Sequence, residues 1–131
     1  MRNRKAILYT LDLPGVIAEA QVIQRNLVKI GLAVELRPIP PGAYYDRLRN
    51  ETDAWDIAWF GWEPDYLDPS TYLNALFEGN AGANFTHFDS RKYNGLLRHA
   101  ARLRGRPRYT AYGKLDVQLA RDQRPRLQSN T

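Results

Sequence analysis

The chain has 131 residues, 44% of them hydrophobic and 11% aromatic, which suffices for one packed domain. No apolar run approaches the roughly 18 residues that a membrane helix requires. The apolar stretch after the basic start, residues 6–13, is too short for a signal peptide, so we expect no export signal in this chain. Cysteine is absent, which excludes disulfides and thiolate metal sites. The two histidines, His87 and His99, are too few for a metal cluster, and we expect neither a metal nor a cofactor.

The net charge of +5 is concentrated near the carboxyl end. Residues 1–90 hold 8 Lys or Arg against 12 Asp or Glu, whereas residues 91–131 hold 11 against 2. No nucleic-acid-binding signature accompanies these basic residues, so we expect no nucleic-acid partner, with a basic nucleic-acid-binding domain kept as an alternative. We expect the following residues to form a solvated helix face: Arg91, Lys92, Arg98, Arg102, Arg104, Arg106 and Arg108.

The first half of the chain predicts strands and helices in alternation. An apolar strand is expected over residues 6–10, a helix over 14–30 and a strand over 33–37 that ends at Pro38. Short connections between these elements predict a right-handed unit with parallel strands. A short helix over 42–50 precedes a strand over 55–62. That last strand is apolar on both faces, so we expect it to be covered on both sides, with Trp59 in the core.

The second half predicts helices joined by loops. A turn-rich segment precedes a short helix over 70–77, and residues 78–88 form a loop without periodicity. Asp89 or Ser90 is expected to cap a helix that ends at 105–107. The last helix is expected to place four residues on its apolar face: Tyr109, Tyr112, Leu115 and Leu119. From residue 121 the chain is polar and is expected to fray.

Residues 59–69 concentrate the chemistry in the sequence WFGWEPDYLDP, directly after the carboxyl end of a predicted central strand. Glu63, Asp65 and Asp68 are mixed there with Trp62 and Tyr66. Paired carboxylates serve acid/base hydrolysis, and a carboxylate among aromatic rings equally holds an ammonium group. Asp68 alone is expected to cap the following helix. No serine has an evident histidine base and no phosphate-binding loop is present, so we expect no catalytic residues and no enzyme activity.

Several motifs in chain order resemble the family 5 extracellular solute-binding proteins, the dipeptide- and oligopeptide-binding receptors of ABC importers. They are the helix pattern of residues 20–31, then Trp55-Asp56, Gly61-Trp62, Asp65-Tyr66, Asp68-Pro69, Asn84 before an aromatic residue, and Arg108-Tyr109-x-x-Tyr112. The resemblance implies an α/β lobe of the type II periplasmic-binding-protein kind, with a mainly parallel sheet and flanking helices. Residues 1–122 would be part of its C-terminal lobe, and 123–131 a polar tail.

The resemblance also implies a function and a site. The chain would be part of the substrate-binding component of a peptide importer. In the family, the aspartate three residues after the Gly-Trp tryptophan pairs with the α-ammonium of the peptide, and the tryptophan lines the pocket. These positions are Asp65 and Trp62 here, and Tyr66 is expected to join them as a ligand-binding residue.

The chain departs from the family in length, and we expect it to lack the family's lipoprotein signal. Members are several times longer and enclose their ligand between two lobes, so we expect weak peptide binding by this chain alone. The implied partners are a peptide and an ABC permease, and the implied location is extracytoplasmic. A homodimer through the exposed lobe face is a further expectation. A remnant without function and a small carboxylate-based hydrolase stay open as alternatives.

Overall fold

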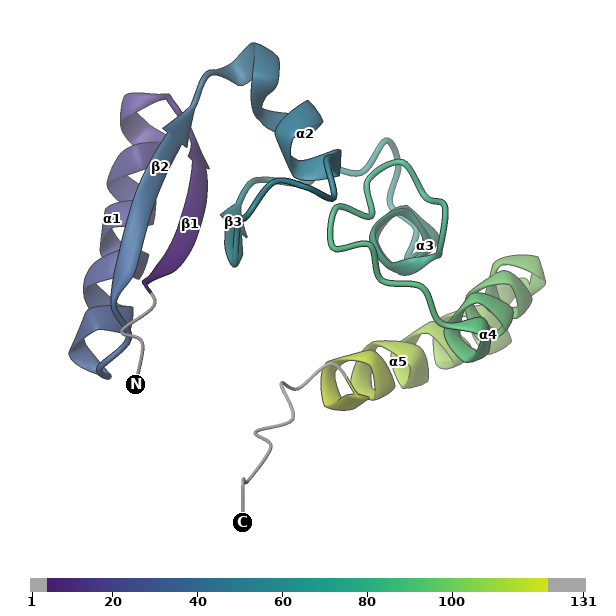
Figure 1. Cartoon of the computed structure of the whole chain (residues 1–131). Coiled ribbons are helices and arrows are strands. Elements are labelled where there is room, and N and C mark those ends of the chain that lie inside the picture. Colours follow the sequence, from purple (N-terminus) through teal and green to yellow (C-terminus); the bar gives the residue numbers. More distant parts are fainter. Residues whose placement is uncertain (1–4, 123–131) are drawn as a thin grey trace. The chain divides into compact units, whose positions relative to one another are not determined.

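The computed structural model describes residues 5–122 (Figure 1). These residues divide into two compact units, Met1–Trp62 and Glu63–Thr131, which are described separately below. No helix within 5–122 is long and apolar enough to cross a membrane. The expected polar tail, 123–131, lies outside the described residues.

The first unit is built on a parallel sheet. Its strands are β1 (Ala6–Leu11), β2 (Val34–Ile39) and β3 (Ile57–Trp59), and its helices are α1 (Pro14–Lys29) and α2 (Pro41–Arg49). The strand order is β2-β1-β3, with Leu8 opposite Leu36 and Ile57. Both pairings are parallel. The predicted parallel α/β fold is therefore confirmed.

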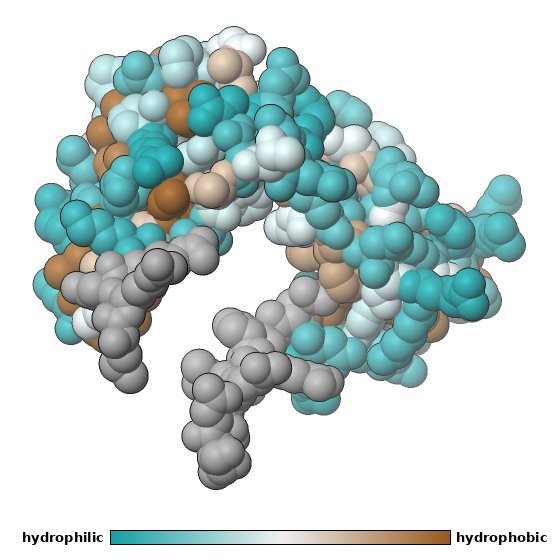
Figure 2. All heavy atoms as spheres, in the orientation of Figure 1, coloured by the Kyte–Doolittle hydropathy of each residue, from teal (hydrophilic) through white to brown (hydrophobic). Residues whose placement is uncertain are grey.

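Helix α1 lies along one face of the sheet (Figure 1). Leu8, Ala20 and Val34 form the buried contact between helix and sheet. The helix begins with Pro14, whose missing N–H needs no partner in a first turn. It is followed by Gly31, whose φ of +89° lies in the left-handed region expected just beyond a helix. Figure 2 shows hydrophobic side chains on the outer surface of the first unit. Val22 and Val28 of α1 are among the exposed hydrophobic residues.

Strand β2 is longer than predicted, because Pro38 does not end it. Pro38 lies within β2 and pairs with Thr10. The carbonyl of Ile39 accepts a hydrogen bond from the amide of Asp12, beyond the end of β1. Since N–H and C=O of one residue in a strand point the same way, the nitrogen of Pro38 faces away from β1 and no ladder hydrogen bond is lost.

Strand β3 is shorter than predicted and Trp59 is not in the core. Only Ile57–Trp59 pair with β1, and the Trp59 side chain is 38% exposed. The carboxylate of Asp56 accepts a hydrogen bond from the amide of Ile7. At this position, where β3 was expected to pair with β1 through its backbone, a side chain makes the bond instead. The Trp59 indole N–H donates to the Glu19 carboxylate at 3.0 Å. An indole with this polar partner is stable at the surface.

The second unit consists of α3 (Ser70–Phe77), α4 (Arg91–Arg102) and α5 (Gly105–Asp122). Ser90 caps α4, as predicted, by accepting a hydrogen bond from the amide of Tyr93. The buried core of the unit is made by α4 and α5: Tyr93, Leu97, Ala100, Tyr112, Leu115 and Leu119. Tyr109, predicted on the apolar face of the last helix, is instead 58% exposed. It lies three residues before Tyr112, at the margin of the buried stripe.

The loop between α3 and α4 is held by asparagine side chains. The Asn84 amide donates to the carbonyls of Glu78 and Phe88 and accepts from the amide of Phe88. Asn94 accepts from the amide of Gly79 and donates to Asp89. These bonds satisfy backbone groups that no helix or strand can pair. The loop predicted over 78–88 is thus an ordered structure.

Candidate ligand-binding site

The second unit opens with the carboxylate-rich segment, defined as residues 63–68. It has no regular structure and leads into α3. The amide of Asp68 donates to the carbonyl of Tyr66 at 3.0 Å, and the Thr71 hydroxyl donates to the same carbonyl at 3.2 Å. These two bonds form a tight turn that leaves the Tyr66 ring 63% exposed.

Asp68 is bound by two neighbours within the second unit. Its Oδ1 accepts hydrogen bonds from the Ser70 amide at 2.9 Å and the Ser70 hydroxyl at 2.6 Å, at the start of α3. Arg108 of α5 donates to both carboxylate oxygens, from Nη2 to Oδ1 at 2.6 Å and from Nε to Oδ2 at 3.0 Å. These bonds hold the pKa of Asp68 well below its usual range. Those from Arg108 have the larger effect and those from Ser70 the next largest. Asp68 was expected to cap this helix; the N-cap position is Pro69, and Asp68, one residue earlier, accepts from the amide and hydroxyl of Ser70, the first residue of α3.

Arg108 does not belong to the solvated helix face, which corrects the prediction. Its side chain is only 16% exposed. Its Nη1 donates to three carbonyls at the end of α4, those of Ala100, Ala101 and Leu103, at 3.3, 2.6 and 3.2 Å. Its guanidinium lies 5.2 Å from the centre of the Tyr112 ring. Arg108 therefore connects the carboxylate-rich segment to α4 and α5.

The spacing of Arg108 contained a signal for this role. Arg108 precedes the buried Tyr112 by four residues, so both side chains lie on one face of α5. An arginine on the apolar face of a helix needs an acceptor. The position of Arg108 on this face distinguishes it from the other basic residues of the region.

Asp65 and Glu63 remain exposed carboxylates. Within the described part of the second unit, residues 63–122, no side chain forms an ion pair or hydrogen bond with either of them. Asp68 is therefore the carboxylate of this segment with an internal structural role. Within 5–122 no three His, Cys, Asp or Glu side chains gather in a way that could hold a metal ion.

Trp62, the other predicted ligand-binding aromatic residue, is the last residue of the first unit. Its side chain is 37% exposed. It follows β3 by three residues, so it leaves the carboxyl end of the sheet, where open α/β sheets bind their ligands.

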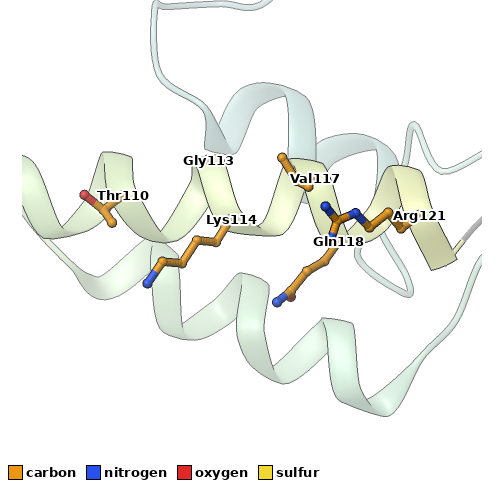
Figure 3. A pocket seen from close by; sticks show the side chains of 6 residues that line it. All are labelled: Thr110, Gly113, Lys114, Val117, Gln118 and Arg121. Atoms are coloured by element: carbon orange, nitrogen blue, oxygen red, sulfur yellow. The ribbon is translucent and has the colours of Figure 1, made fainter.

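The second unit also carries two shallow grooves. One, of about 460 Å³, is lined by residues of α3 and α5, including Tyr72, Tyr109 and Tyr112. The other, of about 420 Å³, runs along α5, where Lys114 and Gln118 extend to the same side of the helix (Figure 3). Neither groove is lined by Asp65 or Tyr66. Asp65 and Tyr66 thus lie on the surface of the second unit, outside both grooves.

Comparison with known proteins identifies the family. Residues 3–84 match the bacterial extracellular solute-binding proteins, family 5, in their middle part. This match covers more than half of the 131 residues and includes the segment that carries Trp62, Asp65 and Tyr66. The chain belongs to this family of solute-binding proteins, as its motifs predicted.

Relatives in this family are much longer than the chain. A probable D,D-dipeptide-binding periplasmic protein of Escherichia coli K12 is 29% identical over 96 residues, which are 71% of this chain and 18% of that protein. The substrate-binding domain of an oligopeptide ABC transporter from Bacillus anthracis superposes with a TM-score of 0.75 at 25% identity, over 88% of this chain and 23% of its own.

A third relative has a peptide bound. It is a periplasmic binding protein associated with an ABC transporter of Helicobacter pylori, in complex with the peptide STSA. It superposes with a TM-score of 0.75 at 27% identity, over 90% of this chain and 24% of its own. The chain thus spans about a fifth to a quarter of these relatives.

Proposed function

We propose that the chain is the part of a peptide-import receptor that recognises the amino terminus of the peptide. Asp65 binds the ligand ammonium, and Trp62 and Tyr66 pack against the ligand. The observation that carries the proposal is the contrast between two carboxylates. Asp68 is occupied by Arg108 and Ser70, whereas Asp65 is exposed and is followed in the chain by the exposed Tyr66.

The chemistry of this arrangement suits an amine. A carboxylate makes charge-assisted hydrogen bonds to an ammonium group, and an aromatic face adds cation–π attraction. The relatives described as dipeptide-binding and as complexed with the peptide STSA support a peptide as the ligand. In the same proposal the protein works with an ABC permease outside the cytoplasm and catalyses no reaction.

A small carboxylate hydrolase is less well supported. Acid/base hydrolysis of a sugar bond needs two carboxyl groups, one of them held protonated. The pKa of Asp68 is lowered and the group is already paired with Arg108, so Asp68 does not supply that acid. Only Glu63 and Asp65 remain in this segment.

The proposal is tested by titrating two tripeptides that differ only in N-acetylation into the 131-residue chain, followed by amide NMR shifts. A single exposed ion pair typically contributes about 0.2 to 1 kcal/mol, so we expect weak binding and a preference for the free amine of about 1.4- to fivefold. Asp65→Asn should abolish this preference. Equal affinity of the unaltered chain for both peptides would overturn the assignment of Asp65.

A further inference from the structure

We infer that Arg108 is a positioning residue. Through its ion pair with Asp68 it holds in place the carboxylate of Asp65, which binds the ligand. The inference rests on the proposed function of Asp65. Asp68 lies three residues after Asp65 and ends the carboxylate-rich segment. Because Arg108 binds both oxygens of Asp68, it fixes the end of the segment in direction as well as in position.

Arg108 itself is held by the core of the second unit. Its Nη1 binds three carbonyls at the end of α4, and its plane lies near the ring of Tyr112, which is 2% exposed. With Nε and Nη2 on Asp68, all three nitrogens of the guanidinium have partners. The orientation of the Arg108 guanidinium is therefore set by α4 and α5. Through Asp68 this orientation constrains the carboxylate-rich segment.

The turn between Asp65 and Asp68 is short enough to transmit this constraint. The carbonyl of Tyr66 accepts from the Asp68 amide, and the single proton of the Thr71 hydroxyl is shared between the carbonyls of Asp68 at 2.6 Å and Tyr66 at 3.2 Å. The backbone on both sides of Asp68 is thus tied to the first turn of α3. Release of the Asp68 side chain would free one end of a segment only six residues long, 63–68.

Charge and position make opposite predictions for the two halves of this ion pair. Arg108→Gln removes a positive charge near Asp65, so a pure field effect would strengthen the binding of an ammonium. Asp68→Asn removes a negative charge, so a pure field effect would weaken it. Loss of positioning lowers the preference for a free amine in both variants. The two variants together separate these mechanisms.

A second ion pair of the same unit supplies matched controls. Arg98 donates from Nε to Glu78 Oε1 at 2.7 Å, just after the last turn of α3, whereas Asp68 precedes its first turn. Arg98→Gln and Glu78→Gln therefore make the same changes of charge without touching the carboxylate-rich segment. Any effect of overall charge on peptide affinity appears in these controls too.

The experiment measures, for the full chain and each variant, the ratio of Kd for N-acetylated and free-amine tripeptides by NMR titration. We expect the ratio to fall from its unaltered value, at most about fivefold, to about one in both Arg108→Gln and Asp68→Asn. Both controls should keep the unaltered ratio. Changes in opposite directions, or an unchanged ratio in both variants, would overturn the inference.

Hydrogen exchange separates this inference from the proposed function. If the unaltered chain does not prefer the free amine, the proposed function fails, but positioning is still measured by amide exchange at residues 65–68 without peptide. Faster exchange in Arg108→Gln than in Arg98→Gln supports positioning, and equal exchange contradicts it. Arg108→Lys keeps the charge without the planar fork, so it provides the same comparison should Arg108→Gln fail to fold.

Discussion

The hydroxyl of Tyr44 in α2 donates a hydrogen bond to the carbonyl of Trp59, the last residue of β3, at 2.9 Å. The carbonyl of Tyr9 in β1 lies 3.3 Å from the same hydroxyl. Tyr44 is fully buried, and its one hydroxyl proton serves chiefly the carbonyl of Trp59, the nearer of these two carbonyls near the carboxyl ends of adjacent strands. The geometry of the chain that leads into Trp62 depends on this contact.

Tyr44→Phe is expected to lower the free energy of unfolding by about 1 to 2 kcal/mol, because the carbonyl of Trp59 loses its buried donor while the ring volume is retained. Urea denaturation at neutral pH measures the change. Tyr45→Phe, at the neighbouring and more exposed position, is the matched control and should change stability less. Equal effects in the two variants would contradict the structural role of the Tyr44 hydroxyl.

Burial raises the pKa of Tyr44 well above its ordinary value. The unfolded chain therefore ionises this tyrosine at lower pH than the folded chain does. Its contribution to stability is complete below the ordinary tyrosine pKa of about 10 and is lost as pH rises above that value. In urea denaturation between pH 8 and about 11, stability should fall less steeply in Tyr44→Phe than in the unaltered chain. A parallel decline would count against a buried, neutral Tyr44.

The Asp68 and Arg108 pair has the opposite dependence on pH. The folded-state pKa of Asp68 is lowered, so its stabilisation is present above the ordinary aspartate pKa of about 3.9 and is lost as pH falls through the lower folded value. Asp68→Asn should cost about 2 kcal/mol at pH 7. The difference in unfolding free energy between the two proteins should shrink below about pH 4. A difference that stays constant down to pH 2 would exclude this ion pair as its source.

Helix periodicity made most of the fold predictable. The sequence did not show which residues far apart in the chain pair with each other. The positions of α1 and α4 followed from apolar residues three and four apart, and Gly31 marked the end of α1. The extent of β3 did not follow, because an apolar run does not say how much of it finds a neighbouring strand. Arg108 was misassigned for a similar reason, since its charge is visible in the sequence and its acceptor is not.

Glycines of the second unit offer a paired test. A Cβ on Gly79 would lie 2.5 Å from Asp89 Oδ1 and 2.9 Å from Asn94 Nδ2, which bond to each other. Gly79→Ala is therefore expected to destabilise the chain by about 1 to 3 kcal/mol. Gly95→Ala, on the exposed side of α4 with open space around it, should stabilise by about 0.5 to 1 kcal/mol. Thermal unfolding followed by circular dichroism compares them, and a shift of the same sign in both would contradict this account of Gly79.

The Asn84 side chain allows donor and acceptor roles to be separated. Its Oδ1 accepts from the amide of Phe88 at 3.2 Å, while its Nδ2 donates to the carbonyls of Phe88 and Glu78 at 2.6 and 3.1 Å. Asn84→Asp keeps the acceptor but turns a carboxylate oxygen toward two carbonyls. We expect this variant to lose about 2 kcal/mol or more, because two acceptors lose their donor and face a negative charge.

Lowering the pH provides the control for Asn84→Asp. A carboxyl group placed against two carbonyls has a raised pKa in the folded state, and once protonated it can donate to one of them. Its cost should therefore be largest at neutral pH and diminish as pH falls toward about 4, whereas the cost of Asp68→Asn should diminish only below about pH 4. Urea denaturation at pH 7, about pH 4.5 and about pH 3 measures both trends. A cost independent of pH would mean that the Asn84 amide does not donate to these carbonyls.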